Sequence, residues 1–290
     1  MSYALLFPGQ GSQRMGMGKE LYEEHIVARQ ILESACEFLD YDLKKIMFEG
    51  PEEVLTDTIY AQPAIYVCSA MYLEKVKKEG ISYSYVAGHS LGEYSALYAS
   101  GAVSFLDGLA LVEKRGRAMG EENGKGCMAA VTGMTEEMLK PIVEAEKDVV
   151  IANLNTETQL TLSGTEQGIG AVTQVLEAYD EVVVKRLAVS AAFHSPQMKR
   201  AANKMRQVIE QTIMHTPSIY MVPNVTGIPT KDIDAIRELL FLQITGQVRW
   251  KDSILAIRDA GVEGFYEVGC GRVLKRIHPF ILTEPKCYSV

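Results

Sequence analysis

The sequence is poor in the residues and patterns that indicate a disulfide framework or a metal site. It has only 5 cysteines and 5 histidines among 290 residues, and it contains no C-x-x-C pair. An odd number of scattered cysteines does not fit a set of paired disulfides, and the histidines lack the spacing of metal ligands. We therefore expect a protein of the reducing cytoplasm that holds no metal.

Long apolar runs and an excess of positive charge are also missing. No run of about 18 apolar residues occurs, and the chain does not open with a basic segment followed by a long apolar stretch. Lysine and arginine number 29 against 37 aspartate and glutamate, which gives a net charge of −8. These features argue against a membrane protein and against a general nucleic-acid binder. The hydrophobic fraction, 47%, suffices for one large domain or two unequal ones.

The pattern G-x-S-x-G at residues 88–92 organises the rest of the chain. Residues 84–87 before it are strand-like, and 93–99 after it have helical character without a breaker. A strand that turns at once into a helix needs glycines where the two elements nearly touch, and Ser90 then lies on a strained bend. At the helix N-terminus the Leu91 N–H can stabilise an oxyanion. Such short patterns also occur by chance in turns, but the flanking elements favour a nucleophile elbow.

A glycine-rich loop at 8–13 ends a short apolar run at 3–7. The run is of the kind that is buried in a parallel sheet. Gly9 and Gly11 let the backbone approach a ligand closely, so Gln10 can present its N–H or its side-chain amide to an oxyanion. An ordinary strand-to-helix turn explains the same residues equally well.

The helix predicted from Ser104 to about Glu121 carries two candidate arginines. Arg115 lies near the edge of the apolar stripe and can lean into a cleft. Its helical angle is too close to that of Arg117 for periodicity to separate the two. Composition alone favours a solvated arginine at either position.

His194 is the candidate general base. A serine hydroxyl is a weak nucleophile and needs a neighbouring base, and histidine titrates in the right range. His194 lies at a domain boundary beside Pro196 and small residues, whereas the other histidines stand in ordinary helical, loop or tail positions or next to Ser90. A purely structural histidine remains an alternative, and no carboxylate stands out as a third member of a triad.

Residues 124–190 differ in periodicity from the rest of the chain. They are predicted to form strands and helices in the order β-α-β-β-α-β, which is typical of a ferredoxin-like unit. We predict an α/β protein with a hydrolase-like large domain, containing a parallel sheet and the nucleophile elbow, at 1–123 and 191–290. The ferredoxin-like domain at 124–190 is inserted in it and forms one wall of a cleft. The expected strands are 128–131, 149–154, 159–162 and 182–189, and the expected helices are 135–146 and 165–179.

Several ordered motifs together resemble the malonyl-CoA:acyl carrier protein transacylases, and the resemblance covers nearly the whole chain. The short, stand-alone format is similar to the trans-acting acyltransferases of polyketide synthases. The motifs are Phe7-Pro8-Gly9-Gln10-Gly11-Ser12-Gln13, Gly88-His89-Ser90-Leu91-Gly92-Glu93-Tyr94, Arg115-Gly116, Ala192-Phe193-His194-Ser195 and Glu267-Val268-Gly269.

The resemblance implies a role for each matching residue. A backbone carbonyl in the segment 247–250, that of Arg249, would orient the base and replace a triad carboxylate. Phe193 fits the malonyl-selective pattern, and Gln62 would line the pocket. The remaining roles implied are nucleophile for Ser90, general base for His194, partner of the malonyl carboxylate for Arg115, and oxyanion hole for Gln10 and the Leu91 N–H.

The activity implied is transfer of malonyl from malonyl-CoA to the phosphopantetheine thiol of an acyl carrier protein, in fatty acid or polyketide biosynthesis. The coenzyme A thioester is a substrate, and no permanently bound cofactor is expected. Two alternatives are an acyl hydrolase that clears carrier-bound chains, which Arg115 disfavours, and a non-catalytic carrier-docking module.

A basic run on the helix after His194 is a candidate surface for docking the carrier protein, and a solvated helix face is equally possible. Its residues are Lys199, Arg200, Lys204 and Arg206.

Overall fold

The computed structural model describes residues 2–189 and 191–290, and a parallel β-sheet lies at its centre. Within these ranges the sheet has 5 strands in the order β7-β2-β1-β8-β9, and every neighbouring pair is parallel. Parallel neighbours need crossover connections, which here contain the helices. The strands are β1 (Tyr3–Phe7), β2 (Tyr83–Gly88), β7 (Tyr220–Val222), β8 (Phe265–Glu267) and β9 (Cys287–Ser289).

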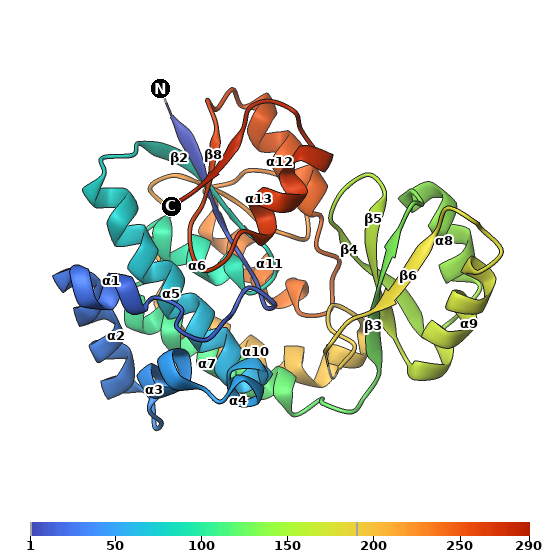
Figure 1. Ribbon diagram of the computed structural model, residues 1–290, viewed down its shortest axis with the longest axis horizontal. Coiled ribbons are helices and arrows are strands. Elements are labelled where there is room, and N and C mark those ends of the chain that lie inside the picture. Colours follow the sequence, from blue (N-terminus) through green and yellow to red (C-terminus); the bar gives the residue numbers. More distant parts are fainter. Residues whose placement is uncertain (1, 190) are drawn as a thin grey trace.

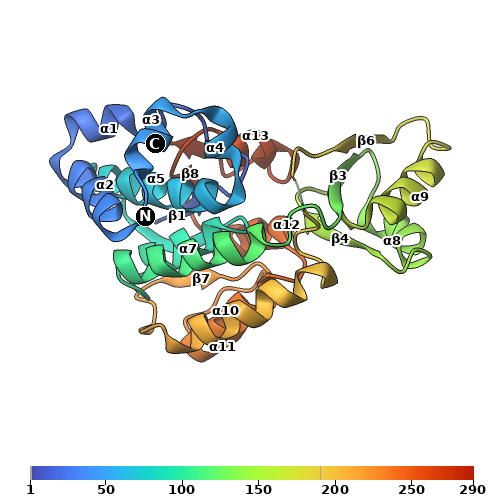
Figure 2. The ribbon, with the colours of Figure 1, turned by 90° about the horizontal axis from the view of Figure 1, so that it is seen from below.

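Both faces of this sheet are covered by helices (Figures 1 and 2). Leu5 and Phe7 of β1 belong to a core shared with α2, α5, α6 and α7, whereas Ala4 and Leu6 pack with α12 and α13. Alternate residues of a strand point to opposite faces, so two covered faces explain the continuous apolar run of β1. These helices are α2 (Ile26–Phe38), α5 (Thr58–Lys78), α6 (Gly92–Ala99), α7 (Phe105–Gly120), α12 (Trp250–Asp259) and α13 (Val273–Ile277).

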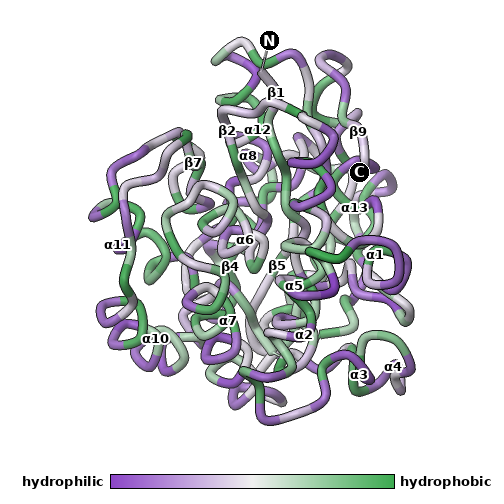
Figure 3. Tube along the Cα trace, turned by 90° about the vertical axis from the view of Figure 1, so that its left-hand side faces the viewer, coloured by the Kyte–Doolittle hydropathy of each residue, from purple (hydrophilic) through white to green (hydrophobic). Residues whose placement is uncertain are grey.

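Helix α5 runs through the middle of the first core, and every residue from 61 to 71 is buried. In Figure 3 the hydrophobic colour gathers on the central strands and α5, while the hydrophilic colour gathers on outer turns such as α10.

No helix among residues 2–189 and 191–290 is long and apolar enough to span a bilayer. The other helical elements outside residues 124–190 are α1 (Lys19–Glu24), α3 (Leu43–Glu49), α4 (Glu52–Thr56), α10 (Lys199–Gln211) and α11 (Ile233–Gln243), with short 3₁₀ turns at Pro196–Met198 and His278–Phe280.

A second, antiparallel sheet with its own core lies to one side of the first (Figure 1). Its strand order, β4-β5-β3-β6, and its chain order β-α-β-β-α-β are those of a ferredoxin-like unit, as predicted. The domain limits 124–190 remain a prediction, and residue 190 lies outside the described ranges. The elements are β3 (Cys127–Thr132), α8 (Glu136–Glu144), β4 (Val149–Leu154), β5 (Gln159–Gly164), α9 (Glu166–Leu176) and β6 (Val183–Arg186).

The two sheets are joined through β4. Val248, from the segment before α12, donates its N–H to the Ala152 carbonyl at 2.8 Å and accepts from the Leu154 N–H at 2.9 Å. These bonds form an isolated parallel bridge between Asn153 and Val248. A main-chain segment of the large unit thus continues the edge of the small sheet and fixes one corner of the space between them.

Candidate active site

Ser90 lies on a sharp bend between β2 and α6, with a φ of 52°. A Cβ on Gly88 would lie 1.8 Å from the carbonyl carbon of Gly92, and a Cβ on Gly92 would lie 2.1 Å from the Phe7 carbonyl oxygen. Real Cβ atoms do not approach so closely, so both positions need glycine. The strand therefore turns into the helix within a few residues, and the serine is held in a left-handed conformation that non-glycine residues rarely adopt.

His194, which follows the small sheet in the chain, faces Ser90. Its Nε2 lies 2.6 Å from the Ser90 Oγ, and its Nδ1 lies 2.8 Å from the main-chain carbonyl oxygen of Gln243. A carbonyl oxygen only accepts hydrogen bonds, so Nδ1 carries the proton and Nε2 is free to accept one from the serine.

The sequence-based assignment of Arg249 as the residue that orients His194 is wrong. The Arg249 carbonyl instead accepts from the N–H of Ser253 at 3.0 Å and from its Oγ at 2.9 Å, in the first turn of α12. The Arg249 carbonyl is therefore used by the first turn of α12. The carbonyl that His194 contacts belongs to Gln243, the last residue of α11.

The surroundings of His194 keep its imidazole neutral. Burial, followed by the nearby positive charge of Arg115, lowers the pKa of His194 to about 3, although the Gln243 carbonyl opposes this shift. A proton on Nε2 would have to be carried in a site that already holds a guanidinium. The neutral form, which is the form that acts as a base, therefore predominates at neutral pH.

Arg115 is almost completely buried, with 1% of its surface exposed. Its Nη2 donates to the Ser90 Oγ at 3.1 Å and to the Gln243 Oε1 at 3.0 Å, while its Nη1 donates to the Gln62 Oε1 at 2.8 Å. Its Nε–H is buried and has no acceptor among the described residues. An unpaired buried donor is uncommon in folded proteins. The guanidinium also lies over the Tyr94 ring, 5.4 Å from its centroid.

Arg115 and Arg117 have different surroundings in the structure, although helical periodicity alone does not distinguish them. The Arg117 side chain is 42% exposed and pairs with Glu113 and, at 2.9 Å, with Asp40. It lies on the outside of α7, away from Ser90.

Gln62 does not line the cavity, contrary to the sequence-based assignment. It is 1% exposed, and its Oε1 accepts from Arg115 while its Nε2 lies 3.7 Å from the Met119 Sδ. The close packing of α5 against α7 puts the amide behind the guanidinium, where it holds the arginine in place.

Gln243, Asn224 and Glu93 form a buried network of hydrogen bonds with the main chain of the elbow. The sequence did not predict this network. The Gln243 Nε2 donates to the Ser90 carbonyl and to the Glu93 Oε2, both at 2.8 Å. Asn224 accepts from the Ser90 N–H at 2.8 Å and donates to the Gly88 carbonyl at 2.6 Å. Gln243 is thus in contact with His194, Arg115 and Ser90 at once, so one residue fixes their relative positions.

Glu93 anchors this network from a fully buried position. Its Oε2 accepts from Gln243 and from the Asn224 N–H, but its Oε1 has no partner among the described residues. Burial raises the pKa of Glu93 to about 7, against the lowering effect of the two donors and of Arg115. The charge state of this carboxyl therefore changes near neutral pH.

Two main-chain N–H groups border the site. Those of Leu91 and Gln10 have no hydrogen-bond acceptor in the described part of the chain. The Gln10 side chain points its Nε2 at the Thr58 Oγ1, 3.1 Å away, so its main-chain N–H rather than its amide is the donor left for an oxyanion. Of the two options open from the sequence, the structure favours the backbone.

A cavity of about 100 Å³ lies beside Ser90, with walls from both units. Met119 and Phe193 of the large unit contribute apolar surface, and the small unit contributes the strand residues Met128 and Asn153. No group of three or more potential metal ligands occurs in the described ranges. The full lining is Gln10, His89, Ser90, Leu91, Arg115, Met119, Met128, Asn153, Leu187, Val189, Phe193 and His194.

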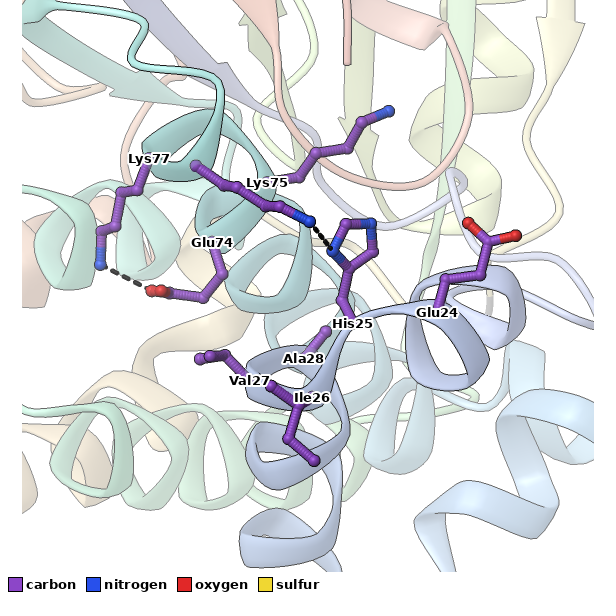
Figure 4. Close-up of a pocket in the computed structure, with 9 residues that line it drawn as sticks. Glu24, His25, Ile26, Val27, Ala28, Glu74, Lys75 and Lys77 are labelled. Atoms are coloured by element: carbon purple, nitrogen blue, oxygen red, sulfur yellow. Dashed lines mark hydrogen bonds and ion pairs between the residues drawn. The ribbon is translucent and has the colours of Figure 1, made fainter.

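A larger cavity, of about 580 Å³, lies between α2 and the far end of α5 (Figure 4). Lys77 on its rim pairs with Glu74 at 2.6 Å, and the Lys78 Nζ lies 3.4 Å from the His25 Nδ1. Lys77 is about four helical turns, or about 20 Å, further along α5 than Gln62. This cavity is therefore separate from the Ser90 site.

Comparison with known proteins gives consistent matches along nearly the whole chain. The family model of the acyl transferase domain matches residues 4–276. A malonyl CoA-acyl carrier protein transacylase of Bacillus subtilis (strain 168) is 41% identical, over 98% of this chain and 94% of the relative. The polyketide biosynthesis malonyl CoA-acyl carrier protein transacylase BaeC of Bacillus velezensis is 40% identical over 93% of each chain. The crystal structure of an acyl-carrier-protein S-malonyltransferase from Bartonella henselae has a TM-score of 0.96 at 37% identity, covering 100% of this chain and 95% of that one.

Proposed function

Because the chain belongs to the malonyl-CoA:acyl carrier protein transacylase family, we propose that it transfers malonyl from coenzyme A to the phosphopantetheine thiol of an acyl carrier protein. The family resemblance inferred from the motifs is confirmed by these matches. The observation that carries the proposal is the double contact of the Ser90 Oγ, at 2.6 Å from the His194 Nε2 and 3.1 Å from the Arg115 Nη2. A nucleophile, its base and a carboxylate-binding cation thus share one cavity.

In the first half-reaction the Ser90 Oγ attacks the thioester carbonyl of malonyl-CoA. The His194 Nε2 takes the hydroxyl proton, and the carbonyl electrons move onto the oxygen. When the tetrahedral intermediate collapses, the C–S bond breaks and His194 returns the proton to the departing coenzyme A thiolate. The product is a malonyl ester of Ser90 and free coenzyme A.

In the second half-reaction the phosphopantetheine thiol of the carrier replaces coenzyme A. His194 removes the thiol proton as sulfur attacks the ester carbonyl, and then returns that proton to the Ser90 Oγ as the C–O bond breaks. The Gln243 carbonyl keeps the proton on Nδ1 throughout, so that Nε2 remains the nitrogen that exchanges protons. The enzyme ends in its starting state.

The oxyanion of both tetrahedral intermediates is assigned to the Leu91 and Gln10 N–H groups. Both donors lack a protein acceptor and border the Ser90 cavity. Leu91 is the N-cap residue of α6, so the positive end of that helix dipole also stabilises the oxyanion. Gln10 lies in the loop after β1.

Malonyl selection is assigned to Arg115, with Phe193 limiting the space for bulkier acyl groups. The guanidinium lines the cavity, with its Nη2 beside the Ser90 Oγ, and a guanidinium is suited to donate hydrogen bonds to a carboxylate. Phe193 lines the cavity and is itself 6% exposed, so its ring is a fixed wall. The buried position of Arg115 also favours a transferase over the alternative of a neutral-acyl hydrolase.

The proposed reaction also bears on the compartment, the cofactor requirement and the pathway. We place the protein in the cytoplasm, with the coenzyme A thioester as a substrate and no resident cofactor. The similarity to BaeC supports a stand-alone, trans-acting acyltransferase that loads a carrier in polyketide biosynthesis, and the similarity to the Bacillus subtilis transacylase supports the same reaction in fatty acid biosynthesis.

One labelling experiment tests the proposal. The protein is mixed with malonyl-CoA radiolabelled in the malonyl group, first alone and then with a carrier protein that bears phosphopantetheine. We expect label on the protein, absent from Ser90→Ala, followed by its movement to the carrier. Release of free malonate instead would identify a hydrolase, and no covalent label on the wild-type protein would identify a docking module.

A further inference from the structure

Three arginines surround a surface cavity of about 450 Å³ beside the loop that follows β1. They are Arg14, Arg272 and Arg276, and all three are exposed. None of the ion pairs in the described part of the chain includes any of them. Arg272 and Arg276 are four residues apart at α13 and so lie on one face, where like charges repel. We call this feature the arginine cavity.

Most basic residues of two other groups, on α10 and at the far end of α5, pair with neighbouring side chains. On α10, Arg200 and Lys204 pair with Glu121, and Arg206 pairs with Glu238 at 3.2 Å. The basic run predicted as a docking surface is therefore largely occupied by internal ion pairs. The lysines near the far end of α5 also have partners, as Figure 4 shows for Lys77 and Glu74.

The arginine cavity adjoins the active site through two consecutive residues. Gln10 lines the cavity beside Ser90, and Gly11 lines the arginine cavity. A partner seated on the arginines would therefore stand at the edge of the site, close enough for a flexible arm to reach inward. Val273, which is 41% exposed, adds an apolar contact between the charges.

We propose that the arginine cavity is the docking surface for the acidic acyl carrier protein in the second half-reaction. The inference rests on the proposed function, because a carrier is needed only if Ser90 passes its acyl group to one. Complementary charge steers such an encounter and orients the partner, and unpaired arginines offer the strongest attraction. Coenzyme A also carries negative charge, on the phosphates beyond its pantetheine arm, so acylation by malonyl-CoA has to be measured separately from transfer to the carrier.

The test compares two acceptors with the double variant Arg272→Glu/Arg276→Glu. We expect the KM for the carrier protein to rise about tenfold or more, and the fall in transfer between about 0.01 M and 0.15 M salt to disappear. Transfer to free pantetheine, and acylation of Ser90 by malonyl-CoA, should stay within about twofold of wild type. The neutral variant Arg272→Gln/Arg276→Gln should show a smaller rise in KM, and it serves if the charge reversal impairs folding.

The matched control is Lys199→Glu/Lys204→Glu, which makes the same change of charge on α10. An unchanged carrier KM in the arginine variants, or a larger rise in the α10 variant, would overturn the docking proposal. An equal loss of acylation by malonyl-CoA would overturn it too, because the arginines would then serve coenzyme A or the fold. Failure of wild-type Ser90 to take up label would instead contradict the proposed function itself, so the two failures are distinguishable.

Discussion

The Nη2 of Arg115 lies 3.1 Å from the Oγ of Ser90, so the cation assigned to the malonyl carboxylate already touches the nucleophile. In the free protein this contact favours the deprotonated hydroxyl. In the proposed acyl-enzyme, the Nη2 that faces Ser90 would donate to the malonyl carboxylate, while Gln62 and Gln243 continue to hold the guanidinium. The arginine is therefore held in position before the substrate arrives.

Replacing Arg115 by alanine should invert acyl selectivity. Loss of a charge-assisted pair with the substrate should lower malonyl kcat/KM by tens- to thousands-fold, or about 2–4 kcal/mol. Ser90, His194 and the oxyanion donors remain, so acetyl-CoA should gain in relative rate. Steady-state transfer from both thioesters measures the ratio.

Arg117→Ala is the control for this variant, since Arg117 lies two positions along α7 but pairs with Asp40 on the outside. We expect it to change malonyl transfer by less than about twofold. Equal loss of malonyl and acetyl transfer in Arg115→Ala, or greater damage from Arg117→Ala, would refute the carboxylate-binding role.

His194→Ala should slow both half-reactions by about 10²–10⁴-fold while the protein remains folded. In the wild type, the acylation rate should stay flat from pH 8 down to pH 5. The reason is that a base whose pKa is lowered to about 3 remains unprotonated over this range, whereas an ordinary histidine would lose activity below about pH 6.5. Stopped-flow acylation across pH measures this, and a mid-point near 6.5 would contradict it.

Glu93 should make the protein less stable as pH rises from about 4.5 to 7. In this window the unfolded carboxyl ionises while the buried one, with its pKa raised to about 7, stays protonated. The loss amounts to about 3 kcal/mol and levels off above pH 7. Urea unfolding of wild type and Glu93→Gln at several pH values should show the variant gaining relative stability with pH, and a constant difference would exclude this effect.

Gly92→Ala should destabilise the protein by about 3 kcal/mol or more, because its Cβ would overlap the Phe7 carbonyl oxygen and neither backbone can move freely. Gly170→Ala is the matched control, since a Cβ there meets nothing within 4 Å inside α9. It should be neutral or stabilising by about 0.5–1 kcal/mol. Thermal unfolding of both variants checks the pair, and equal losses would argue against steric overlap at the elbow.

Local patterns of the sequence predicted the elbow and the small sheet, because strand, turn and helix signals there lie within a few residues of one another. Gly88 and Gly92 indicate that β2 and α6 approach each other closely, and these two elements are adjacent in the sequence. The order β-α-β-β-α-β likewise needs only periodicity. The sequence does not predict β9, because Cys287–Ser289 follow Pro285 and Lys286 and are not an apolar run.

Residues brought in from distant segments could not be located in the same way. Gln243 contacts His194 through its main chain, which has no side-chain signature, and the assignment fell on Arg249 instead. A signal existed in the lone amide near the end of the apolar run 239–244, and another in Asn224, which closely follows the apolar run 219–222. Arg115 and Arg117 were inseparable because their roles depend on α5 and the loop at Asp40 rather than on α7.

The size of the Ser90 cavity bears on what becomes of the acyl ester. The cavity has a volume of about 100 Å³, and its walls include the apolar side chains of Met119, Met128 and Phe193. Apolar walls offer a water molecule few hydrogen-bond partners beside the acyl ester. We therefore expect hydrolysis of the ester to be slow compared with attack by a thiol.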